Sequence, residues 1–284
     1  MDLEISATRF TSFIEQSYHR GIARGNMFLL ISILTVAVGI PSLVYSSGGA
    51  SICDENLPVV DLNSPDAAEN LVAAFQSWGF SYVKGHEVDE VIIEEAEKHA
   101  KRFFKLPPRV KRQAFENFPR QFTKTDRGWS DLRDETLDVF GKVPDLKEVL
   151  DVGFVNQSSP NSYRNKREYL GENKWPANSN DLKTAIQTYA ESSAEVAHEV
   201  LRLLAKGLGA EGAFDDAFNE DALQVQRLTN YPPSDKIEDK KEGEIGAGVH
   251  SDYGGITVLH ADGPGLEILR PNKTSPLVCI EKFL

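Results

Sequence analysis

Apolar positions recur at helical spacing in three parts of the chain. Leu71, Phe75 and Trp78 lie on one face of a helix predicted over residues 67–78. A second amphipathic stretch predicts a helix over residues 88–104, which the prolines of 106–108 end. The longest stretch predicts a helix over residues 182–208, with Gly209 as its C-cap. Short apolar or alternating runs predict strands at residues 57–62, 79–86, 223–228, 246–249, 256–260 and 266–269.

Helices therefore concentrate early in the chain and strands late, which indicates an α+β protein. The pattern divides the chain into three parts. Residues 1–50 form an N-terminal extension, residues 57–175 a mixed helical and strand region, and residues 176–284 a strand-rich core. A charged loop at residues 235–244 separates two of the late strands.

Residues 27–45 contain no charged side chain, and their length is close to the roughly 20 residues of a membrane-spanning helix. Arg9, Arg20 and Arg24 precede this run, and the next basic residue is Lys84. The asymmetry predicts a single-pass membrane anchor with the rest of the chain on the non-cytoplasmic side. Three alternatives stay open: a cleaved signal peptide, a buried helix of a cytoplasmic protein, and an artefact of the gene model.

The charge balance argues against one class of partner. The chain has 31 basic and 43 acidic residues and a formal net charge of −12. An acidic protein has no general attraction for phosphate backbones, so no nucleic acid is expected as a partner. The basic run at residues 98–112 is interpreted as a solvated helix face. Cys53 and Cys279 lie too far apart in sequence to indicate a disulfide framework or a cysteine-rich metal site.

His250 and Asp252 are the strongest candidates for chemistry. Residues i and i+2 of a strand project to the same face, so we expect both side chains on one side of a strand. Ligands of one ion would then lie about 3 to 5 Å apart. Gly254 and Gly255 would let the chain turn close to that ion. A histidine and a carboxylate are two members of the 2-His-1-carboxylate triad that holds iron(II), although most such triplets are surface turns.

Several segments, in order, resemble the isopenicillin-N-synthase-like family of iron(II)/2-oxoglutarate-dependent oxygenases. HSDYGGITVLHAD at residues 250–262 is similar to the segment that carries the iron ligands in that family. The resemblance covers about residues 57–270. It includes LPVVDL (57–62), WGFSYVKGH (78–86), AKRFFKLPPRVKR (100–112), RGW (127–129), PDLKEVLDVG (144–153), NKWP (173–176) and QRLTNYPP (226–233).

The resemblance implies an incomplete double-stranded β-helix, or jelly-roll-like, core with flanking helices. It implies hydroxylation or a related oxidation of a small organic molecule, with Fe(II), 2-oxoglutarate as co-substrate, and oxygen. Carried over by position, His250 and Asp252 would be iron ligands, and Tyr231 would donate its hydroxyl to the co-substrate. Thr229 stands where many members have asparagine. The alternative for Tyr231 is a strand tyrosine before a Pro-Pro turn.

One departure from the family pattern bears on activity. The family's second iron histidine and its Arg-x-Ser pair follow the aspartate by several tens of residues. Here no histidine follows His260, which is itself expected in the core or on the surface, and the printed chain ends at Leu284. The resemblance thus predicts a core truncated at its C-terminus, with very slow or no turnover. The alternative is a non-catalytic remnant or binding module of the same fold, and a membrane-anchored structural protein would rest only on residues 27–45.

Overall fold

An eight-stranded mixed sheet forms the centre of the protein in the computed structural model, with strand order β3-β4-β1-β8-β2-β7-β6-β5. The structure describes residues 3–6, 30–38, 57–115, 127–137, 143–153, 173–215, 223–233, 236–248, 250, 252, 255–263, 266–269 and 277–279. The strands of this sheet are β1 (Leu3–Ser6), β2 (Leu30–Val38), β3 (Val59–Asp61), β4 (Phe80–Lys84), β5 (Gly128–Ser130), β6 (Glu148–Gly153), β7 (Leu223–Asn230) and β8 (Thr257–Ala261).

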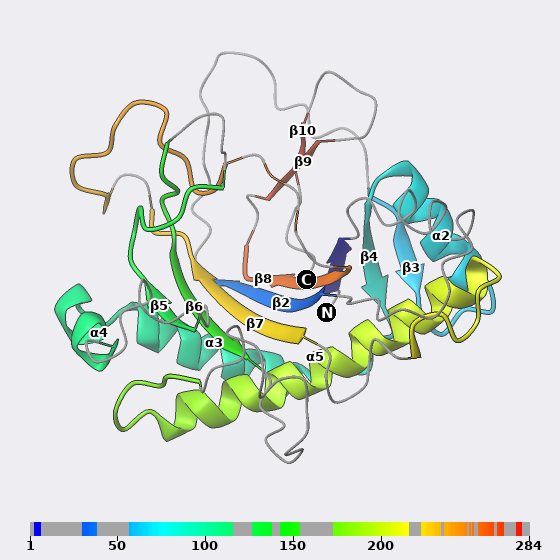
Figure 1. Ribbon diagram of the computed structural model, residues 1–284, viewed down its shortest axis with the longest axis horizontal. Helices are drawn as coiled ribbons and strands as arrows, with labels where there is room; N and C mark the ends of the chain where they lie inside the picture. The colour runs from blue at the N-terminus through cyan, green and yellow to red at the C-terminus, as the bar shows by residue number, and fades with distance from the viewer. Residues whose placement is uncertain are drawn as a thin grey trace, which may run out of the picture.

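The principal helices cover one face of this sheet (Figure 1). They are α2 (Ala67–Ser77), α3 (Glu90–Phe104), α4 (Pro108–Phe115) and the 28-residue α5 (Asn180–Gly207). At 1.5 Å per residue, α5 is about 42 Å long, enough to pass beneath most of the strands. Its buried face joins α2, α3 and the apolar side of the sheet in one core cluster, which includes Leu150, Leu228 and Val258. Three helices were therefore predicted correctly, with shifts of one or two residues at some ends.

Local sequence signals fix the ends and the crossing of these helices. The Asp89 side chain accepts a hydrogen bond from Val91 N at 2.9 Å, which caps the start of α3. Gly209 has φ +65° and follows the end of α5, which confirms the predicted cap. A Cβ on Gly207 would lie 2.5 Å from Ala68 O, so α5 can approach α2 this closely only with glycine at that position.

The helix predicted over residues 27–45 is wrong for Leu30–Val38, which form β2. This strand lies between β7 and β8 and runs parallel to both. A central parallel strand is apolar on both faces, so its sequence is an uncharged, continuous hydrophobic run. The sequence of a membrane helix has the same pattern. None of the helices in the part of the chain described has the length and apolar character needed to cross a bilayer. Membrane or cytoplasmic location stays a prediction, as does the division of domains at residue 175.

Further differences from the sequence predictions concern strands and the basic run. Residues 246–248, predicted to be in a strand, lie outside any strand, while β7 extends to Asn230. Strands β5 and β6 were not predicted, because β5 has only three residues and charged residues interrupt the apolar pattern of β6. Within the basic run at 98–112, Lys111 is only 2% exposed and pairs with Glu148, so this run is not a wholly solvated face.

A second sheet lies on the side of the main sheet opposite α5 (Figure 1). It pairs β9 (Glu267–Leu269) with β10 (Leu277–Cys279) in antiparallel register. Ile268 is 2% exposed and belongs to a small apolar cluster with Leu57 and Tyr82. This contact attaches the second sheet to the β3–β4 end of the molecule.

Candidate metal centre

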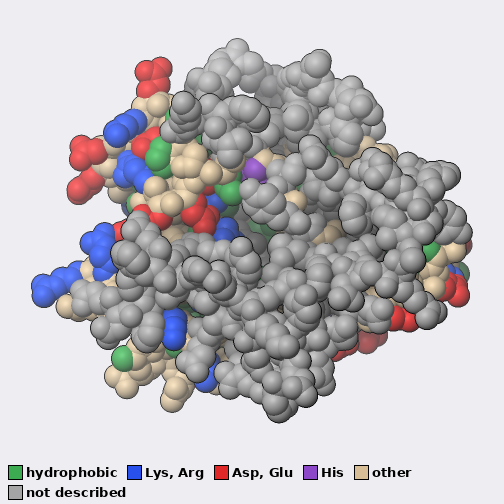
Figure 2. Space-filling model, in the orientation of Figure 1, with side chains coloured by type: hydrophobic (Ala, Val, Ile, Leu, Met, Phe, Trp, Pro, Cys, Tyr) green, Lys and Arg blue, Asp and Glu red, His purple; other side chains and the backbone are tan. Residues whose placement is uncertain are grey.

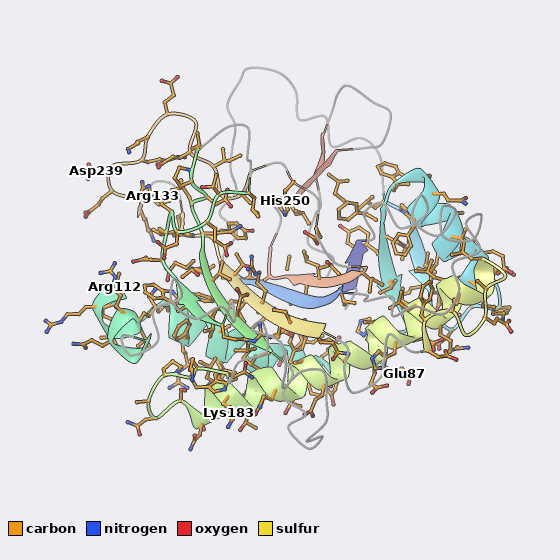
Figure 3. The ribbon with its side chains drawn as sticks, viewed as in Figure 1. Glu87, Arg112, Arg133, Lys183, Asp239 and His250 are labelled. Atoms are coloured by element: carbon orange, nitrogen blue, oxygen red, sulfur yellow. The ribbon has the colours of Figure 1, made fainter. Side chains whose placement is uncertain are left out.

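His250 lies on the face of the main sheet opposite α5 (Figure 3), and the Asp252 side chain lies next to it. His250 Nε2 is 3.5 Å from Asp252 Oδ1, within the separation predicted from the sequence. The predicted reason was wrong, because both residues lie outside the strands. Their side chains are 35% and 37% exposed, so the pair is accessible from solvent. In the same orientation, Figure 2 shows a histidine reaching the surface where Figure 3 labels His250.

A backbone contact determines which nitrogen of His250 faces Asp252. His250 Nδ1 lies 2.7 Å from the carbonyl oxygen of Gly248. A carbonyl oxygen only accepts hydrogen bonds, so Nδ1 carries the proton in this contact. In the neutral ring, Nε2 then presents its lone pair on the side of Asp252, which is the form that a metal ligand requires.

Thr257, the first residue of β8, orients the Asp252 carboxylate. Its hydroxyl donates to Asp252 Oδ2 at 2.7 Å, which leaves Oδ1 directed toward His250. The His250 hydrogen bond lowers the pKa of Asp252; partial burial opposes this, and Thr257 adds to the lowering. Conversely, Asp252 raises the pKa of His250 despite partial burial, and the Gly248 carbonyl contributes. The two groups therefore stabilise each other's charged forms.

Thr229 lies at the end of β7, and Tyr231 is the residue just after this strand. Both were proposed to contact the co-substrate. Thr229 is 2% exposed, and its Cα pairs with Val149 of β6. Burial raises the pKa of Tyr231 to about 12, and Asp252 is among the charges that act on its hydroxyl. Gly246 packs against the Tyr231 ring, since a Cβ at 246 would lie 2.9 Å from Tyr231 Cδ1. Tyr231 thus shares the electrostatic surroundings of Asp252, while a direct role for either residue stays a prediction.

Arg227 forms an ion-pair network beside this site that the sequence analysis did not identify. Its Nε and Nη2 each donate to Asp151 at 2.8 Å, and its Nη1 and Nη2 reach Glu135 at 3.1 and 3.2 Å. Burial alone would lower the pKa of Arg227, but Asp151 and Glu135 outweigh it and raise the pKa. The charge of Arg227 also contributes to the lowered pKa of Asp252, which places this network near the candidate ligands.

Side chains of residues 144–153 bind distant parts of the chain on both faces of the sheet. On the site face, Asp151 binds Arg227, and Asp145 accepts from Gly248 N at 3.0 Å. On the helix face, Glu148 binds the Nζ of Lys111 and two further groups: it accepts from Trp129 Nε1 at 3.0 Å and from Asn230 Nδ2 at 3.3 Å. The resemblance implied no roles for the residues of this segment. If β6 had been predicted as a strand, the charged residues on both of its faces would have indicated buried pairs.

The donor set fits part of an iron site. Two ligands about 2.1 Å from one ion, at angles between about 90° and 140°, lie about 3 to 4 Å apart. The separation of 3.5 Å between His250 Nε2 and Asp252 Oδ1 falls in this range. Within the residues that the structure describes, no cluster of three or more His, Cys, Asp or Glu side chains could hold a metal ion.

Comparison with known proteins identifies relatives with this chemistry. The family described as non-haem dioxygenase in morphine synthesis, N-terminal, matches residues 57–178. The 2-oxoglutarate-Fe(II) type oxidoreductase hxnY of Emericella nidulans is 34% identical over 195 residues, covering 67% of this chain and 54% of the relative. Validamycin A dioxygenase of Streptomyces hygroscopicus subsp. limoneus is 29% identical over 216 residues, covering 72% and 57%. The chain spans about half the length of these curated relatives.

Two solved structures align with about two thirds of this chain. A 2OG-Fe(II) oxygenase family protein from Caulobacter crescentus aligns with a TM-score of 0.52 at 26% identity, covering 66% of this chain and 59% of the other. A full-length Neurospora crassa protein, solved in complex with alpha-KG, aligns with a TM-score of 0.54 at 25% identity, covering 70% and 61%. These matches show that the chain belongs to the 2-oxoglutarate-Fe(II) oxygenase family.

Proposed function

We propose that this protein is an iron(II)/2-oxoglutarate-dependent oxygenase that oxidises a small organic molecule, with His250 and Asp252 as two of the iron ligands. The observation that carries the proposal is the 3.5 Å separation of His250 Nε2 and Asp252 Oδ1 in a chain of this family. Bound iron would supply redox chemistry with oxygen and 2-oxoglutarate. His250 and Asp252 would hold the metal through their free nitrogen lone pair and carboxylate oxygen.

The protein's own groups would orient these ligands and the co-substrate. Thr257 holds one carboxylate oxygen of Asp252 and leaves the other for the metal. Tyr231, with a pKa of about 12, stays protonated at neutral pH and is available as a hydrogen-bond donor to an anionic co-substrate. Thr229 is a weaker candidate for the same role because its side chain is buried in the sheet.

A double-stranded β-helix fold is part of the same proposal. The eight-stranded sheet and the β9–β10 pair would be the two sheets of a double-stranded β-helix, with the candidate ligands between them. Support comes from the second sheet, which lies on the same side of the main sheet as His250 (Figures 1 and 3). The isopenicillin-N-synthase-like subfamily is part of this finer prediction.

A second candidate function is a non-catalytic binding module of the same fold. The observation in its favour is the solvent-accessible pair of His250 and Asp252, which by itself can bind a metal ion without any chemistry following. The two candidates differ in turnover: an oxygenase consumes oxygen and releases succinate from 2-oxoglutarate, whereas a binding module would bind metal or ligand without turnover.

The test combines metal binding and turnover. Mn²⁺ binding is measured by calorimetry, and succinate release is measured with Fe(II), 2-oxoglutarate and oxygen. His250→Gln and Asp252→Asn should abolish both signals. His99→Gln should leave both unchanged, because His99 lies on α3 and pairs with Glu95. The resemblance predicts very slow or no turnover for this chain, so slow succinate release that is lost in both ligand variants would support the oxygenase. Binding without any succinate release would favour the module, and neither signal in the unmodified protein would refute both candidates.

A further inference from the structure

Gly248 connects a candidate metal ligand to a buried carboxylate on a distant segment. Its N–H donates to Asp145 Oδ1 at 3.0 Å, and its carbonyl oxygen lies 2.7 Å from His250 Nδ1. Asp145 and Gly248 are 103 positions apart in sequence, so this contact is tertiary. The Gly248 carbonyl at 2.7 Å and the Asp252 carboxylate at 3.5 Å both only accept hydrogen bonds from the ring, and the shorter contact favours the proton on Nδ1 when His250 is neutral.

The Asp145 carboxylate is fixed in place by other groups. Its side chain is 1% exposed, and Lys147 Nζ lies 2.9 Å from Oδ2. The backbone N–H of Leu137 donates to the same oxygen at 3.2 Å. Asp145 N also donates to the carbonyl oxygen of Glu135 at 2.8 Å. A carboxylate held by an ammonium and a backbone N–H has little freedom to move, so its second oxygen presents a fixed acceptor to Gly248.

Two further contacts attach the chain just before Gly248 to the same region. Leu146 N donates to Ile245 O at 2.9 Å, and Arg133 binds Glu244 through two nitrogens at 2.7 and 2.9 Å. These contacts fix the loop that approaches the site. The Asp145 contact is nearest to His250 among these three attachments, and it acts on the residue whose carbonyl bonds the imidazole.

We propose that Asp145 is a positioning residue for His250: by holding Gly248, it selects the Nδ1–H tautomer and directs Nε2 toward Asp252. Its importance for metal binding rests on the proposed function. The tautomer itself is a property of the metal-free protein, so the two can be tested separately. Hydrogen bonds from a ligand histidine to an outer partner typically change metal affinity about 10- to 100-fold.

The first measurement reads the tautomer without metal. Long-range ¹⁵N–¹H spectra of histidine rings are recorded at about pH 9, well above the ordinary imidazole pKa of about 6.5. The His250 signals are assigned with His250→Gln. We expect the Nδ1–H form in the unmodified protein and a mixture of both tautomers in Asp145→Ala. Asp145→Asn should keep the original form, because its amide oxygen can still accept from Gly248 N.

A variant that loses structure for other reasons would mislead, so matched controls are required. Asp145→Ser retains a polar side chain that is too short to reach Gly248, so it replaces Asp145→Ala if near-ultraviolet dichroism shows that the alanine variant is unfolded. Glu148→Gln alters a buried carboxylate paired with a lysine on the opposite face of the same segment. It should lower the melting temperature while leaving the His250 tautomer unchanged.

The second measurement is Mn²⁺ affinity of the same variants by calorimetry. We expect about a 10-fold or larger loss in Asp145→Ala or Asp145→Ser, and less than about a two-fold change in Glu148→Gln. If the unmodified protein binds no Mn²⁺ but the tautomer shifts as expected, the proposed function fails and the positioning role stands. If Asp145→Ala and Asp145→Ser keep the original tautomer, the positioning role is overturned whatever the metal affinity.

Discussion

Neutralising Glu97 tests how strongly helix α3 is attached to strand β8, the strand that begins at Thr257. Glu97 Oε1 lies 2.7 Å from Nε2 of His260, and Glu97 Oε2 lies 2.6 Å from Lys101 Nζ. The side chains of His260 and Glu97 are only 2% and 15% exposed. Burial raises the pKa of Glu97, but the hydrogen bonds from His260 and Lys101 outweigh it and lower the pKa to about 2.

The size of the effect follows from this lowered pKa. A carboxyl group with a pKa of about 2 when folded and 4.5 when unfolded stabilises the fold above pH 4.5. This stability is lost as the pH falls toward 2. The difference of about 2.5 units, at about 1.36 kcal/mol per unit, gives about 3 kcal/mol at pH 7, an upper value because solvent screens the partly exposed Lys101. At pH 3 the same relation leaves about 1 kcal/mol, so the contribution falls by about 2 kcal/mol.

Urea unfolding of the unmodified protein and Glu97→Gln measures this directly. The free energy of unfolding should be about 2 to 3 kcal/mol lower in the variant at pH 7, and the difference should shrink to about 1 kcal/mol at pH 3. Glu95→Gln is the control, since Glu95 lies on the same helix with its side chain 47% exposed. Its unfolding midpoint should not change. A difference between Glu97→Gln and the unmodified protein that is the same at both pH values would refute the reasoning.

Three other substitutions test the contacts of the site and the core. Thr257→Val removes the hydroxyl that holds Asp252, so Mn²⁺ affinity should fall about 10-fold, while Thr257→Ser should retain it; equal affinities would contradict the role of this hydroxyl. Lys111→Met leaves the buried Glu148 carboxylate without its ammonium partner and should cost about 3 to 5 kcal/mol in urea unfolding, with partial recovery on adding Glu148→Gln. Gly207→Ala places a methyl group 2.5 Å from a backbone carbonyl oxygen of α2, so the free energy of unfolding should fall by about 1 to 3 kcal/mol, measured as a lower melting temperature.

The helices were predictable from the sequence because their pattern is local. Positions three and four apart in α2, α3 and α5 carry the residues that become buried, and the capping residues at Asp89 and Gly209 lie at their ends. Strand β2 was not predictable in this way. Its neighbours β7 and β8 come from the other end of the chain, and only their pairing distinguishes its apolar run from a membrane helix.

The candidate ligands were predictable, but the cause of their proximity was not. Spacing of two positions selected His250 and Asp252, on the expectation of a strand that the structure does not form there. Their geometry comes instead from the Gly248 carbonyl and the Thr257 hydroxyl. Each of these groups is held by tertiary contacts that no local pattern contains.

The alternation of charges before and within β6 connects stability and function in one segment. Asp145, Lys147 and Asp151 direct their side chains to partners on the site face, whereas Glu148 binds Lys111 on the helix face. Within β6, alternation places Glu148 and Asp151 on opposite faces of the sheet, whereas Asp145 precedes the strand and reaches Gly248 from irregular backbone. Asp145 and Asp151 are buried and paired, so a substitution at either should change both the geometry around His250 and the unfolding free energy. A substitution at Glu148 should change the unfolding free energy and leave the geometry around His250 unaltered, because its partners Lys111 of α4 and Trp129 of β5 lie away from His250.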